Sequence, residues 1–289
     1  MALDELYQQY KPLLFSIAYR MLGTFSDAED IVQDVFLHAG ERNLARIENK
    51  KAYLCKMVTN SCLDHLKSAR KKREVYIGPW LPEPLIFGEN DPYGEVVRGE
   101  LVSFAALLLF EKLTPIERAV FILREVLEYD YSAISEIVGR SETTCRKIFS
   151  RVKKKLPGLG EEEIKVNSSR KEAIIGSFLS AIFAGNVKQL ENLVSDDVTL
   201  YSDGGGKVYA AIKPIHTRAF VLRFIESLTK QIVTEGDNTA QVTIANVNGQ
   251  TGVVAVGVDN VKNVISFRVV NNMIQEIYVV RNPEKLKHI

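Results

Sequence analysis

Cysteine is scarce in this chain of 289 residues, and its three cysteines do not stand at metal-ligand spacing. Cys55, Cys62 and Cys145 all fall inside segments with helical periodicity, where a free cysteine behaves as a small apolar side chain. Disulfides persist in oxidising compartments, and this pattern does not indicate them. We therefore expect no metal site and a reducing compartment.

Long apolar runs and a large net charge are also missing. The most apolar stretch, LVSFAALLLF (101–110), is too short to span a bilayer and is followed by charged residues. The N-terminus, MALDELYQQY, is amphipathic and does not have the pattern of a secretory signal. The formal net charge is only +1, so overall charge does not indicate nucleic-acid binding. We expect a soluble cytoplasmic protein that needs no cofactor.

Three successive helices are predicted over residues 114–156. Thr114 and Glu117 fit a capping box at the start of the first helix. Asp130 can cap the second helix, and Gly139 suits the tight turn before the third because glycine tolerates positive φ. A short helix, a glycine turn and a longer helix are typical of a helix-turn-helix.

The last of these helices, capped by Ser141, has one apolar and one basic face. Apolar residues recur at i, i+3, i+4, i+7 and i+11 from Cys145 to Leu156. The basic face favours DNA binding, with the recognition helix last. A small helical bundle with a solvated basic face is the alternative. The residues expected to bind DNA are Thr143, Arg146, Lys147, Ser150, Arg151 and Lys154.

An acidic amphipathic helix, SDAEDIVQDVFLHAG, is predicted over residues 26–40. Ser26 and Glu29 fit a capping box at its start. The helix dipole explains an acid in the first turn, such as Asp30, but not Asp34, which lies beyond that turn. Asp34 therefore needs another explanation.

Residues 3–22 and about 52–70 are also predicted to be amphipathic helices, and the second runs into the basic segment KSARKKR. Lysine and arginine neutralise phosphate, asparagine reads base edges, and aromatic faces stack on unpaired bases. A merely solvated charged face is the alternative reading. The residues assigned to DNA on this helix are Tyr53, Lys56, Asn60, Lys67 and Arg70.

The order of these parts resembles the extracytoplasmic-function (ECF) class of bacterial RNA polymerase sigma factors. DAEDIVQDVFLHA resembles the region 2 segment that docks on the clamp helices of the polymerase β′ subunit. KKAYLCKMVTNSCLDHLKSARKKR is similar to the segment that opens and reads the −10 element. SAISEIVGRSETTCRKIFSRVKKKL is similar to the region 4 helix-turn-helix that reads the −35 element.

This resemblance covers nearly all of residues 1–157 and implies binding to core RNA polymerase, through the β′ clamp helices and the β flap, and to promoter DNA. It implies polymerase contacts for Asp30 and Asp34. It also implies that the loop Asn43–Asn49, which contains Arg46, holds a flipped −10 base.

The segment from Tyr76 to about Val97 contains the only tryptophan of the chain, and its prolines forbid a helix. Side chains such as Trp80 and Leu85 are unfavourable in water, so the segment is predicted to dock on another part of the protein. Local packing against its own helical domains is an equal alternative. Trp80, Leu81, Pro82, Glu83 and Pro84 match a linker motif of ECF sigma factors that carry a SnoaL-like C-terminal extension.

The pattern changes after a boundary at PGLGEEEIKVNSS (157–169). Helices predicted over 173–184, 187–193 and 218–228 are followed by strand-like segments with Asn-Gly and Asn-Asn hairpin turns at 248–249 and 271–272. The α+β pattern resembles the SnoaL-like, NTF2-like cone.

Two short motifs, DGGGK and NPEKL, resemble motifs of the sigma-associated cone, where an arginine usually replaces the lysine and an aspartate occurs in the second motif. We expect these motifs to meet the linker, with Glu83 as a partner of Lys207. The regulatory residues implied are Asp203, Gly204, Gly205, Gly206, Lys207, Asn282 and Pro283.

We therefore predict two all-α sigma domains followed by an α+β SnoaL/NTF2-like cone. Residues 1–75 are assigned to region 2, 76–99 to a linker, 100–158 to region 4, 159–168 to a second linker and 169–289 to the cone. The function predicted is promoter-specific transcription initiation, with the cone as a built-in regulator. A separate anti-sigma factor is then not required.

The alternative is a ligand-binding or hydrolytic cone fused to a DNA-binding module, which would make transcription respond to a metabolite. Asp197, Asp203 and His216 are the candidate general bases for such an enzyme. Glycines beside Asp203 suit a tight turn or an anion nest better than a catalytic wall. We therefore expect no enzymatic activity.

Overall fold

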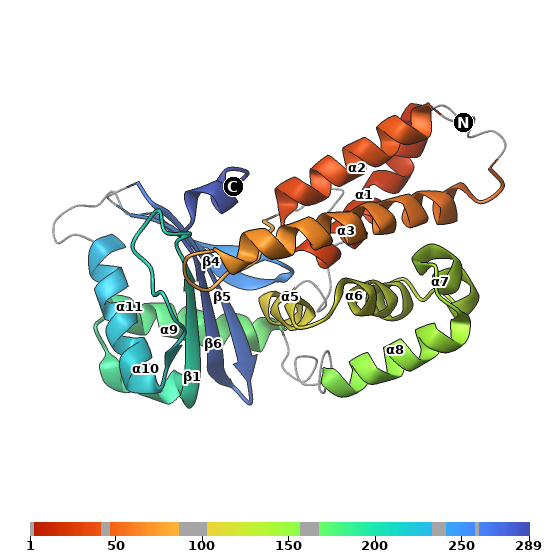
Figure 1. Cartoon of the computed structure of the whole chain (residues 1–289). Coiled ribbons are helices and arrows are strands. Elements are labelled where there is room, and N and C mark those ends of the chain that lie inside the picture. The colour runs from red at the N-terminus through yellow and green to blue at the C-terminus, as the bar shows by residue number, and fades with distance from the viewer. Residues whose placement is uncertain (1–2, 42–46, 87–102, 157–167, 233–240, 258–259) are drawn as a thin grey trace. The chain divides into compact units, whose positions relative to one another are not determined.

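Figure 1 shows the computed structural model of the chain, which describes residues 3–41, 47–86, 103–156, 168–232, 241–257 and 260–289. The chain forms two compact units. The first contains residues 1–75, 88–102 and 106–158, and the second contains 76–87, 103–105 and 159–289. A piece of the predicted linker, 76–87, and a short piece near the start of predicted region 4, 103–105, thus belong to the same compact unit as the C-terminal domain.

The described part of the first unit is entirely helical, as predicted. Its elements are α1 (Leu3–Leu22), α2 (Phe25–Gly40), α3 (Lys50–Glu74), α5 (Phe104–Glu111), α6 (Pro115–Phe121), the π-helical turn η3 (Ile122–Val126), α7 (Tyr131–Val138) and α8 (Glu142–Lys155). Helix α5 starts in the second unit at Phe104 and continues in the first. None of the helices described here is both long and apolar enough to cross a membrane.

Local capping determines where the helices of residues 114–156 begin. Glu117 N donates to Thr114 Oγ1 over 3.3 Å and Thr114 N donates to Glu117 Oε2 over 2.9 Å, so the predicted capping box is present. Asp130 caps α7, and Gly139 ends it with φ 63°. The predicted helix-turn-helix geometry is confirmed.

Helix α2 begins earlier than predicted. Its N-cap is Thr24 and its first residue is Phe25, so the capping box assigned to Ser26 and Glu29 is wrong. Phe25 packs on Phe15 with ring centroids 5.3 Å apart, and this packing places the extra residues in the helix. The helix is amphipathic as predicted, since one side of it is buried through Ala28, Ile31, Val32, Val35, Phe36 and Ala39.

A buried arginine joins α1 and α6 inside the first unit. Arg118 donates to the Phe110 carbonyl over 2.7 Å, to the Met21 carbonyl at the end of α1, and to Glu111 Oε1 over 2.9 Å. Its exposed fraction is 3%. Burial lowers the pKa of the guanidinium to about 10, so it remains charged at neutral pH. The N-terminal helix α1 and the later helix α6 are therefore joined by one charged, buried side chain.

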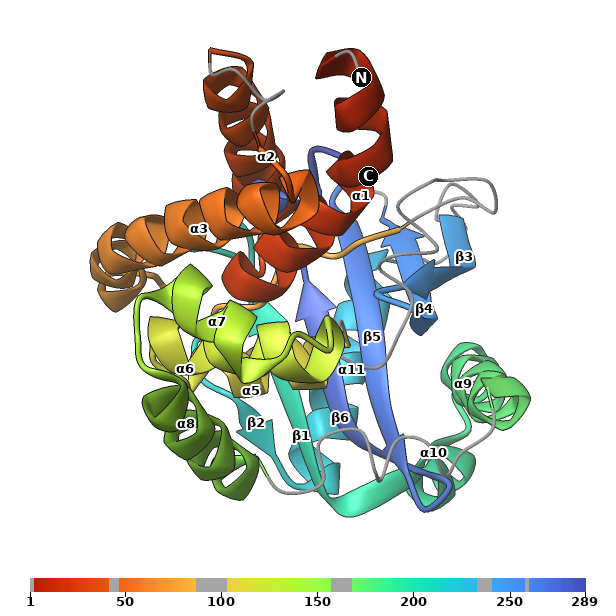
Figure 2. The same ribbon diagram turned by 90° about the vertical axis from the view of Figure 1, so that its right-hand side faces the viewer.

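The second unit is an α+β domain built on one six-stranded sheet (Figure 2). The strand order is β2-β1-β6-β5-β4-β3, with β1 and β6 parallel and the other neighbours antiparallel. The strands are β1 (Val194–Asp203), β2 (Ile215–His216), β3 (Gln241–Val247), β4 (Gln250–Val256), β5 (Lys262–Val270) and β6 (Met273–Val280).

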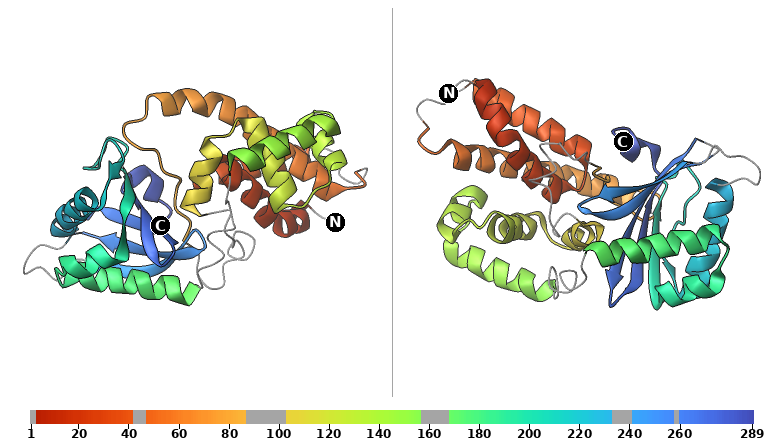
Figure 3. Two further views of the ribbon diagram at one scale, coloured as in Figure 1. Left: turned by 90° about the horizontal axis from the view of Figure 1, so that it is seen from below. Right: turned by 180° about the vertical axis from the view of Figure 1, so that it is seen from behind.

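Helices α9 (Ser168–Phe183), α10 (Val187–Leu193) and α11 (Arg218–Ile232) cover one face of this sheet (Figure 3). Phe178, Ile225 and Phe267 are members of the core between helices and sheet. The predicted hairpin turns are present, with φ 53° at Asn248 and φ 51° at Asn271. A short 3₁₀ helix, η4 (Pro283–Leu286), follows β6.

Candidate functional site

The outer face of α8 is exposed, as the sequence predicts. Thr143, Lys147, Ser150, Arg151 and Lys154 all lie in solvent. On the opposite face Cys145 and Val152 are buried, and Ile148 and Phe149 are half-buried. The helix thus presents hydroxyl and cationic groups along one side, as binding in a DNA groove requires.

Arg146 differs from its exposed neighbours because it already has partners. Its guanidinium lies 4.2 Å from the centroid of the Tyr131 ring and 3.5 Å from Glu142 Oε2. Lys147, Arg151 and Lys154 have no such partner among the described residues. A planar guanidinium resting on an aromatic ring has a defined direction, and this suits contact with a base edge better than contact with phosphate.

Two further lysines of α8 fix the helix to its neighbours. Lys153 pairs with Glu125 over 2.8 Å and Lys155 with Glu117 over 2.5 Å. Burial alone would raise the pKa of Glu117, but the hydrogen bonds from Lys155 and Thr114 outweigh burial and lower it. In the basic run at the end of α8, Lys153 and Lys155 therefore form ion pairs within the unit, whereas Lys154 belongs to the exposed face. Composition alone does not reveal this division.

The surface of α3 presents a second polar face. Lys56, Asn60 and Lys67 are exposed and Tyr53 is half-buried, although Lys67 pairs with Asp64 over 2.7 Å. Arg46 and the side chain of Arg70 lie outside the described residues. In the loop expected to hold a flipped base, Asn49 caps α3 by accepting from Ala52 N over 2.9 Å.

The acidic face of α2 is also available. Asp30 and Asp34 are both exposed, on the side of the helix opposite its buried stripe. His38 Nδ1 lies 2.8 Å from the backbone oxygen of Asp34, so this contact does not involve the Asp34 carboxylate. The helix therefore offers a carboxylate pair to an external partner.

A buried carboxylate organises the other candidate site, which lies in the second unit. Asp203 ends β1 and has an exposed fraction of 0%. Its Oδ1 accepts from Tyr76 Oη over 2.6 Å and Gly205 N over 3.1 Å. Its Oδ2 accepts from Leu81 N over 2.8 Å and Lys285 Nζ over 2.7 Å. The motif at the end of β1 therefore binds the segment that contains Trp80.

Lys285 completes this cluster from the other motif. Besides pairing with Asp203, it donates to the Leu81 carbonyl, and its ammonium lies 4.3 Å from the Trp80 ring and 4.9 Å from the Tyr76 ring. Burial and the Asp203 carboxylate raise the pKa of Tyr76 well above its usual range, so Tyr76 remains a hydrogen-bond donor. The ammonium is thus enclosed by one carboxylate, one carbonyl and two aromatic faces.

The glycines between Asp203 and Lys207 allow this close approach. A Cβ on Gly205 would lie 2.3 Å from Asn282 Nδ2 and 3.1 Å from Tyr76 Oη, and Gly205 has φ 58°. A Cβ on Gly206 would lie 2.8 Å from Ile77 Cδ1. Both position and conformation therefore require glycine here. The turn accepts the linker.

The linker continues along the β3–β4 hairpin. Leu85 N donates to Asn248 Oδ1 over 2.9 Å, and Asn248 N donates to the Leu85 carbonyl over 2.8 Å. Ile86 forms an antiparallel bridge with Val247, and His288 Nε2 donates to the Pro84 carbonyl over 2.8 Å. Every residue of Leu81–Leu85 is buried. Of the two possibilities left open by the sequence, docking on the C-terminal domain is the one observed.

Ser103–Ala105 form a second, separate contact in the same unit. Phe104, with an exposed fraction of 1%, stacks on Tyr278 of β6 with ring centroids 5.7 Å apart. Tyr278 in turn stacks on Tyr201 of β1 at 5.5 Å. No role was predicted for these aromatic residues, nor for Tyr76 or His288. Asn248 was predicted only as a turn residue, and Lys285 only as part of the NPEKL motif. Successive side chains of a strand point to opposite faces of the sheet, so Tyr278 lies on the other face from Ile277 and Val279. This alternation along β6 is the signal that could have identified Tyr278.

One expectation about this site, the pairing of Lys207 with Glu83, is wrong. Lys207 pairs with Glu284 rather than with Glu83, and both of these side chains are about half exposed. Pro283 is exposed as well. The charged residue that contacts the linker is Lys285. Asn282 caps a 3₁₀ turn, and this turn brings Lys285 beside Asp203.

The candidate general bases do not form a catalytic group. Asp203 is enclosed by the linker, whereas Asp197 and His216 are exposed, with Ser195 and Thr199 as their respective neighbours. No cluster of three histidine, cysteine or acidic side chains suited to a metal ion occurs within the described ranges. The arrangement therefore supports a contact between chain segments more than a reaction.

Comparison with known proteins places these surfaces in a family context. Residues 6–72 match the family Sigma-70 region 2, and residues 103–156 match the family Sigma-70, region 4. The ECF RNA polymerase sigma factor SigJ of Mycobacterium tuberculosis (strain ATCC 25618 / H37Rv) is 30% identical over 293 residues, covering 96% of this chain and 91% of that protein.

A second relative and one solved structure agree. The probable ECF RNA polymerase sigma factor SigI of Mycobacterium tuberculosis (strain CDC 1551 / Oshkosh) is 28% identical over 196 residues, covering 66% of this chain and 67% of that protein. The crystal structure of Mycobacterium tuberculosis SigJ superposes with a TM-score of 0.80 at 28% identity and covers 98% of both chains. The likeness to SigJ thus extends through the C-terminal domain as well as the two sigma regions.

Proposed function

The chain belongs to the extracytoplasmic-function (ECF) family of RNA polymerase sigma factors, which direct transcription initiation, and on this premise we propose that its C-terminal domain regulates initiation by holding the interdomain linker. The observation that carries the proposal is the Asp203 carboxylate, which binds Tyr76 and Leu81 of the linker and Lys285 of the C-terminal motif while fully buried. The linker connects the two regions that read the promoter, so its docking influences how they can be arranged.

The expected size of this effect is sufficient for regulation. Burying one side chain such as Leu81 contributes roughly 1.5–3 kcal/mol, and removing one partner of a buried ion pair costs about 3–5 kcal/mol. A bias of a few kcal/mol shifts a two-state equilibrium by one to three decades. A regulator contained in the same chain also removes the need for a separate anti-sigma factor.

We assign promoter contacts to α8 and α3. Arg146, Lys147 and Arg151 of α8 are proposed to contact the −35 element, with Arg146 at a base edge and the other two at phosphates. Lys56 and Asn60 on α3 are proposed to contact the −10 element. Both assignments rest on exposed cations and amides along one helix face.

Asp30 and Asp34 of α2 are proposed to bind the β′ clamp helices of core polymerase, and region 4 the β flap. The proposed division of labour is 1–75 for region 2, 76–99 for the linker, 100–158 for region 4 and 169–289 for the regulatory domain. The place of action that follows is the cytoplasm, where polymerase and promoter meet. We propose no catalytic role for the C-terminal domain, since linker docking encloses Asp203.

Asp203→Ala in the full chain tests the regulatory proposal. The variant should lose the bonds to Tyr76, Leu81 and Lys285, so chymotrypsin should cleave after Tyr76 or Trp80 at least tenfold faster than in the wild type. Promoter-dependent runoff transcription with core polymerase should change as well. Asp197→Ala, an exposed position on the same strand, is the matched control and should behave as the wild type.

Equal cleavage and equal transcription for Asp203→Ala and the wild type would show that the C-terminal domain is a passenger. Faster cleavage with unchanged transcription would confirm the contact but contradict its regulatory role. The rival hypothesis, a metabolite-responsive DNA-binding module, predicts that the protein does not direct core polymerase to a promoter until a small molecule is added.

A further inference from the structure

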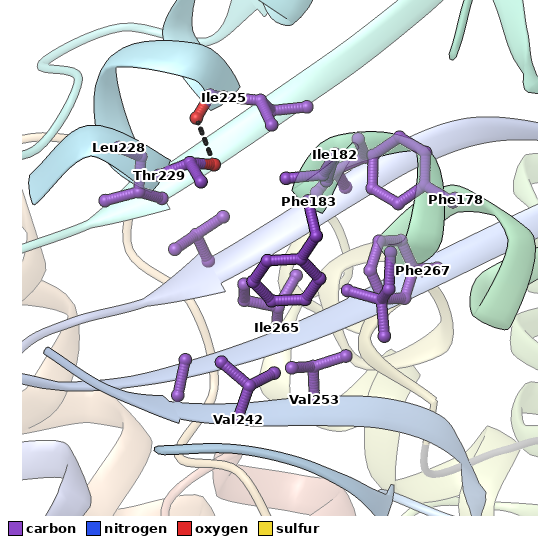
Figure 4. A pocket seen from close by; sticks show the side chains of 14 residues that line it. Phe178, Ile182, Phe183, Ile225, Leu228, Thr229, Val242, Val253, Ile265 and Phe267 are labelled. Atoms are coloured by element: carbon purple, nitrogen blue, oxygen red, sulfur yellow. Dashed lines mark hydrogen bonds between the residues drawn. The ribbon is translucent and has the colours of Figure 1, made fainter. Parts of the chain in front are cut away.

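A cavity of about 380 Å³ lies in the second unit, between the linker and the loop that follows β1. The linker contributes Ile77 and Gly78, and the loop contributes most of the residues from Gly204 to Ile212. Among the residues that the structure describes, this lining has no member in common with that of the apolar space that Figure 4 shows between α9, α11 and the sheet. Of these two spaces, the one beside the linker is therefore a separate candidate for binding.

A buried hydroxyl group lines this cavity. Ser202, next to the last residue of β1, has an exposed fraction of 0%. Its Oγ forms no hydrogen bond with any residue that the structure describes. Most buried polar side-chain atoms in proteins have a hydrogen-bond partner, and a buried hydroxyl without one is unfavourable. An oxygen atom of a bound molecule would supply the partner that Ser202 lacks.

The loop adds further donors to the lining. It forms neither helix nor strand, and the backbone N–H groups of Val208, Ala210 and Ala211 donate to no acceptor in the described part of the chain. Lys207 also lines the cavity, and its ammonium pairs with Glu284. No aspartate or glutamate occurs among the described residues of the lining. The cavity therefore favours a molecule with hydrogen-bond acceptors, and an anion over a cation.

Apolar side chains surround these polar groups. Ile77, Tyr209 and Ile212 line the cavity although each of them is exposed. Large apolar side chains that gather at one exposed place are typical of a binding site, and so is an apolar lining with a few polar groups. Arg281 donates to the Tyr209 carbonyl over 2.7 Å, so the loop is held by the residue that follows β6. The cavity thus has an apolar rim and an anchored wall.

The volume of the cavity limits the size of the ligand. An apolar cavity of about 150 Å³ is large enough for benzene, so about 380 Å³ accepts one ring together with a substituent of several atoms. Pockets for small molecules commonly have volumes of about 300–1,000 Å³. A molecule with one ring or one short branched chain, attached to an acidic head group, matches this space.

We propose that this cavity binds a small organic carboxylate, with its carboxylate at Ser202 and Lys207 and its apolar body against Ile77 and Ile212. Because Ile77 and Gly78 belong to the linker, such a molecule contacts the docked segment and the domain that holds it. A ligand that binds only the docked arrangement stabilises that arrangement. The regulatory meaning of the site rests on the proposed function, whereas ligand binding and protection of the linker do not.

Phenylacetate, phenylacetamide and phenethylamine are suitable probes, because they share one ring and differ in the head group. Each is titrated into the full-length protein, and the isoleucine methyl resonances are followed by NMR. Phenylacetate should bind saturably and shift Ile77 and Ile212, but not Ile265, which lines the apolar space of Figure 4. Phenylacetamide should bind more weakly, and phenethylamine roughly tenfold more weakly than phenylacetate, because its ammonium is repelled by Lys207.

Proteolysis measures the effect of the ligand on the linker. At ten times its Kd, phenylacetate should slow chymotrypsin cleavage after Tyr76 or Trp80 by roughly tenfold, since it binds the docked arrangement alone. Phenethylamine at the same concentration should have little effect. Neither NMR binding nor cleavage depends on transcription, so a failure of the proposed function would leave both results unchanged.

Variants of the lining provide the controls. Ala211→Leu fills the cavity and should abolish both phenylacetate binding and its effect on cleavage, which excludes inhibition of the protease itself. Ala219→Leu, at an exposed position of α11 outside the lining, should behave as the wild type. Ser202→Ala should weaken phenylacetate binding roughly tenfold, because a hydrogen bond to a charged group is lost. Ser195→Ala, on the same strand, should bind phenylacetate as the wild type does.

The unliganded protein gives a further test of the hydroxyl. Because Ser202 Oγ has no partner in the described part of the chain, Ser202→Ala should melt at or above the temperature of the wild type. A lower melting temperature would show that the hydroxyl is already satisfied, and it would overturn the proposal. Absence of saturable binding, equal binding of the three probes, methyl shifts at Ile265 instead of Ile77, or unchanged cleavage in phenylacetate would overturn it as well.

Discussion

At the scale of single residues, Asp203 shows how hydrogen bonds compensate the burial of a carboxylate. It accepts four hydrogen bonds through two oxygens, and one of the donors is an ammonium that is itself enclosed by Trp80 and Tyr76. A buried charge is tolerated when its remaining lone pairs are satisfied in this way. Removing this carboxylate would weaken the docking of the linker, because two of the four donors, Tyr76 and Leu81, belong to that segment.

The sequence predicted one half of this cluster. DGGGK and the linker motif could be paired because a family resemblance identified both, and the need for glycine follows from the turn. The NPEKL motif, which contains Lys285, was also expected to meet the linker. The bonds of Lys285 and Tyr76 to Asp203 could not be predicted, because they depend on a 3₁₀ turn and on the direction in which the chain leaves α3. Short-range geometry of this kind is not encoded in periodicity.

Asp34 carries the prediction for polymerase binding. Asp34→Arg should abolish co-purification with core RNA polymerase, because an exposed acid beyond the first turn of α2 becomes a like charge facing a basic partner surface. The melting temperature should change by less than about 2 °C, since surface substitutions usually alter stability by less than about 0.5 kcal/mol.

Glu136→Arg on α7 is the control for charge reversal, because Glu136 is exposed on a different helix. This variant should still co-purify with polymerase. Retained binding by Asp34→Arg would contradict the assignment of α2 as the docking helix.

At the scale of elements, the sequence was most reliable where one helix or hairpin contains its own signals. The caps at Thr114 and Asp130 and the turn at Asn248 each depend on residues within four positions of one another. It failed at the start of α2, where the packing of Phe25 on Phe15 of another helix decides the boundary. Tertiary packing thus overrode a local capping signal.

Helix α8 carries the prediction for promoter recognition. Replacing Arg146, Lys147 and Arg151 together with alanine should abolish −35-dependent transcription. Loss of a base-reading arginine costs about 1–3 kcal/mol at one position, and loss of phosphate contacts weakens binding to all sequences and reduces the salt dependence. Runoff transcription on promoters with intact and scrambled −35 elements measures both effects.

The chain supplies its own control for this experiment. Lys153 and Lys155 belong to the same helix but pair with Glu125 and Glu117. Lys153→Ala with Lys155→Ala should therefore lower stability slightly and preserve the −35 preference. If the triple variant kept the preference and this double variant lost it, the recognition face would have been misplaced.

At the scale of the whole molecule, the two compact units do not follow the sequence boundaries. Residues 76–87 lie in the predicted linker and residues 103–105 near the start of predicted region 4, yet both belong to the same compact unit as the C-terminal domain. Composition indicated that the first of these segments would dock, but it could not indicate on which partner. Contacts such as Asp203–Leu81, between residues 122 positions apart, lie beyond any local pattern.

Arg118 carries the prediction for the first unit. Arg118→Met should lower its melting temperature by several degrees, since the carbonyls of Met21 and Phe110 lose a buried donor, at a cost of about 1–3 kcal/mol each. Circular dichroism melts would measure the change. Arg140→Met, at an exposed position, should melt as the wild type does. Equal melting of the two variants would show that Arg118 contributes little to the unit.

The contact between Arg118 and Met21 limits how much duplex DNA the first unit can span. Duplex DNA rises about 3.4 Å per base pair. A compact body of about 140 residues has a radius of gyration of only about 15 Å. A first unit closed by Arg118 is therefore about as wide as one turn of duplex, roughly 34–36 Å. We predict that this buried contact opens when two promoter elements more than one turn apart are read together.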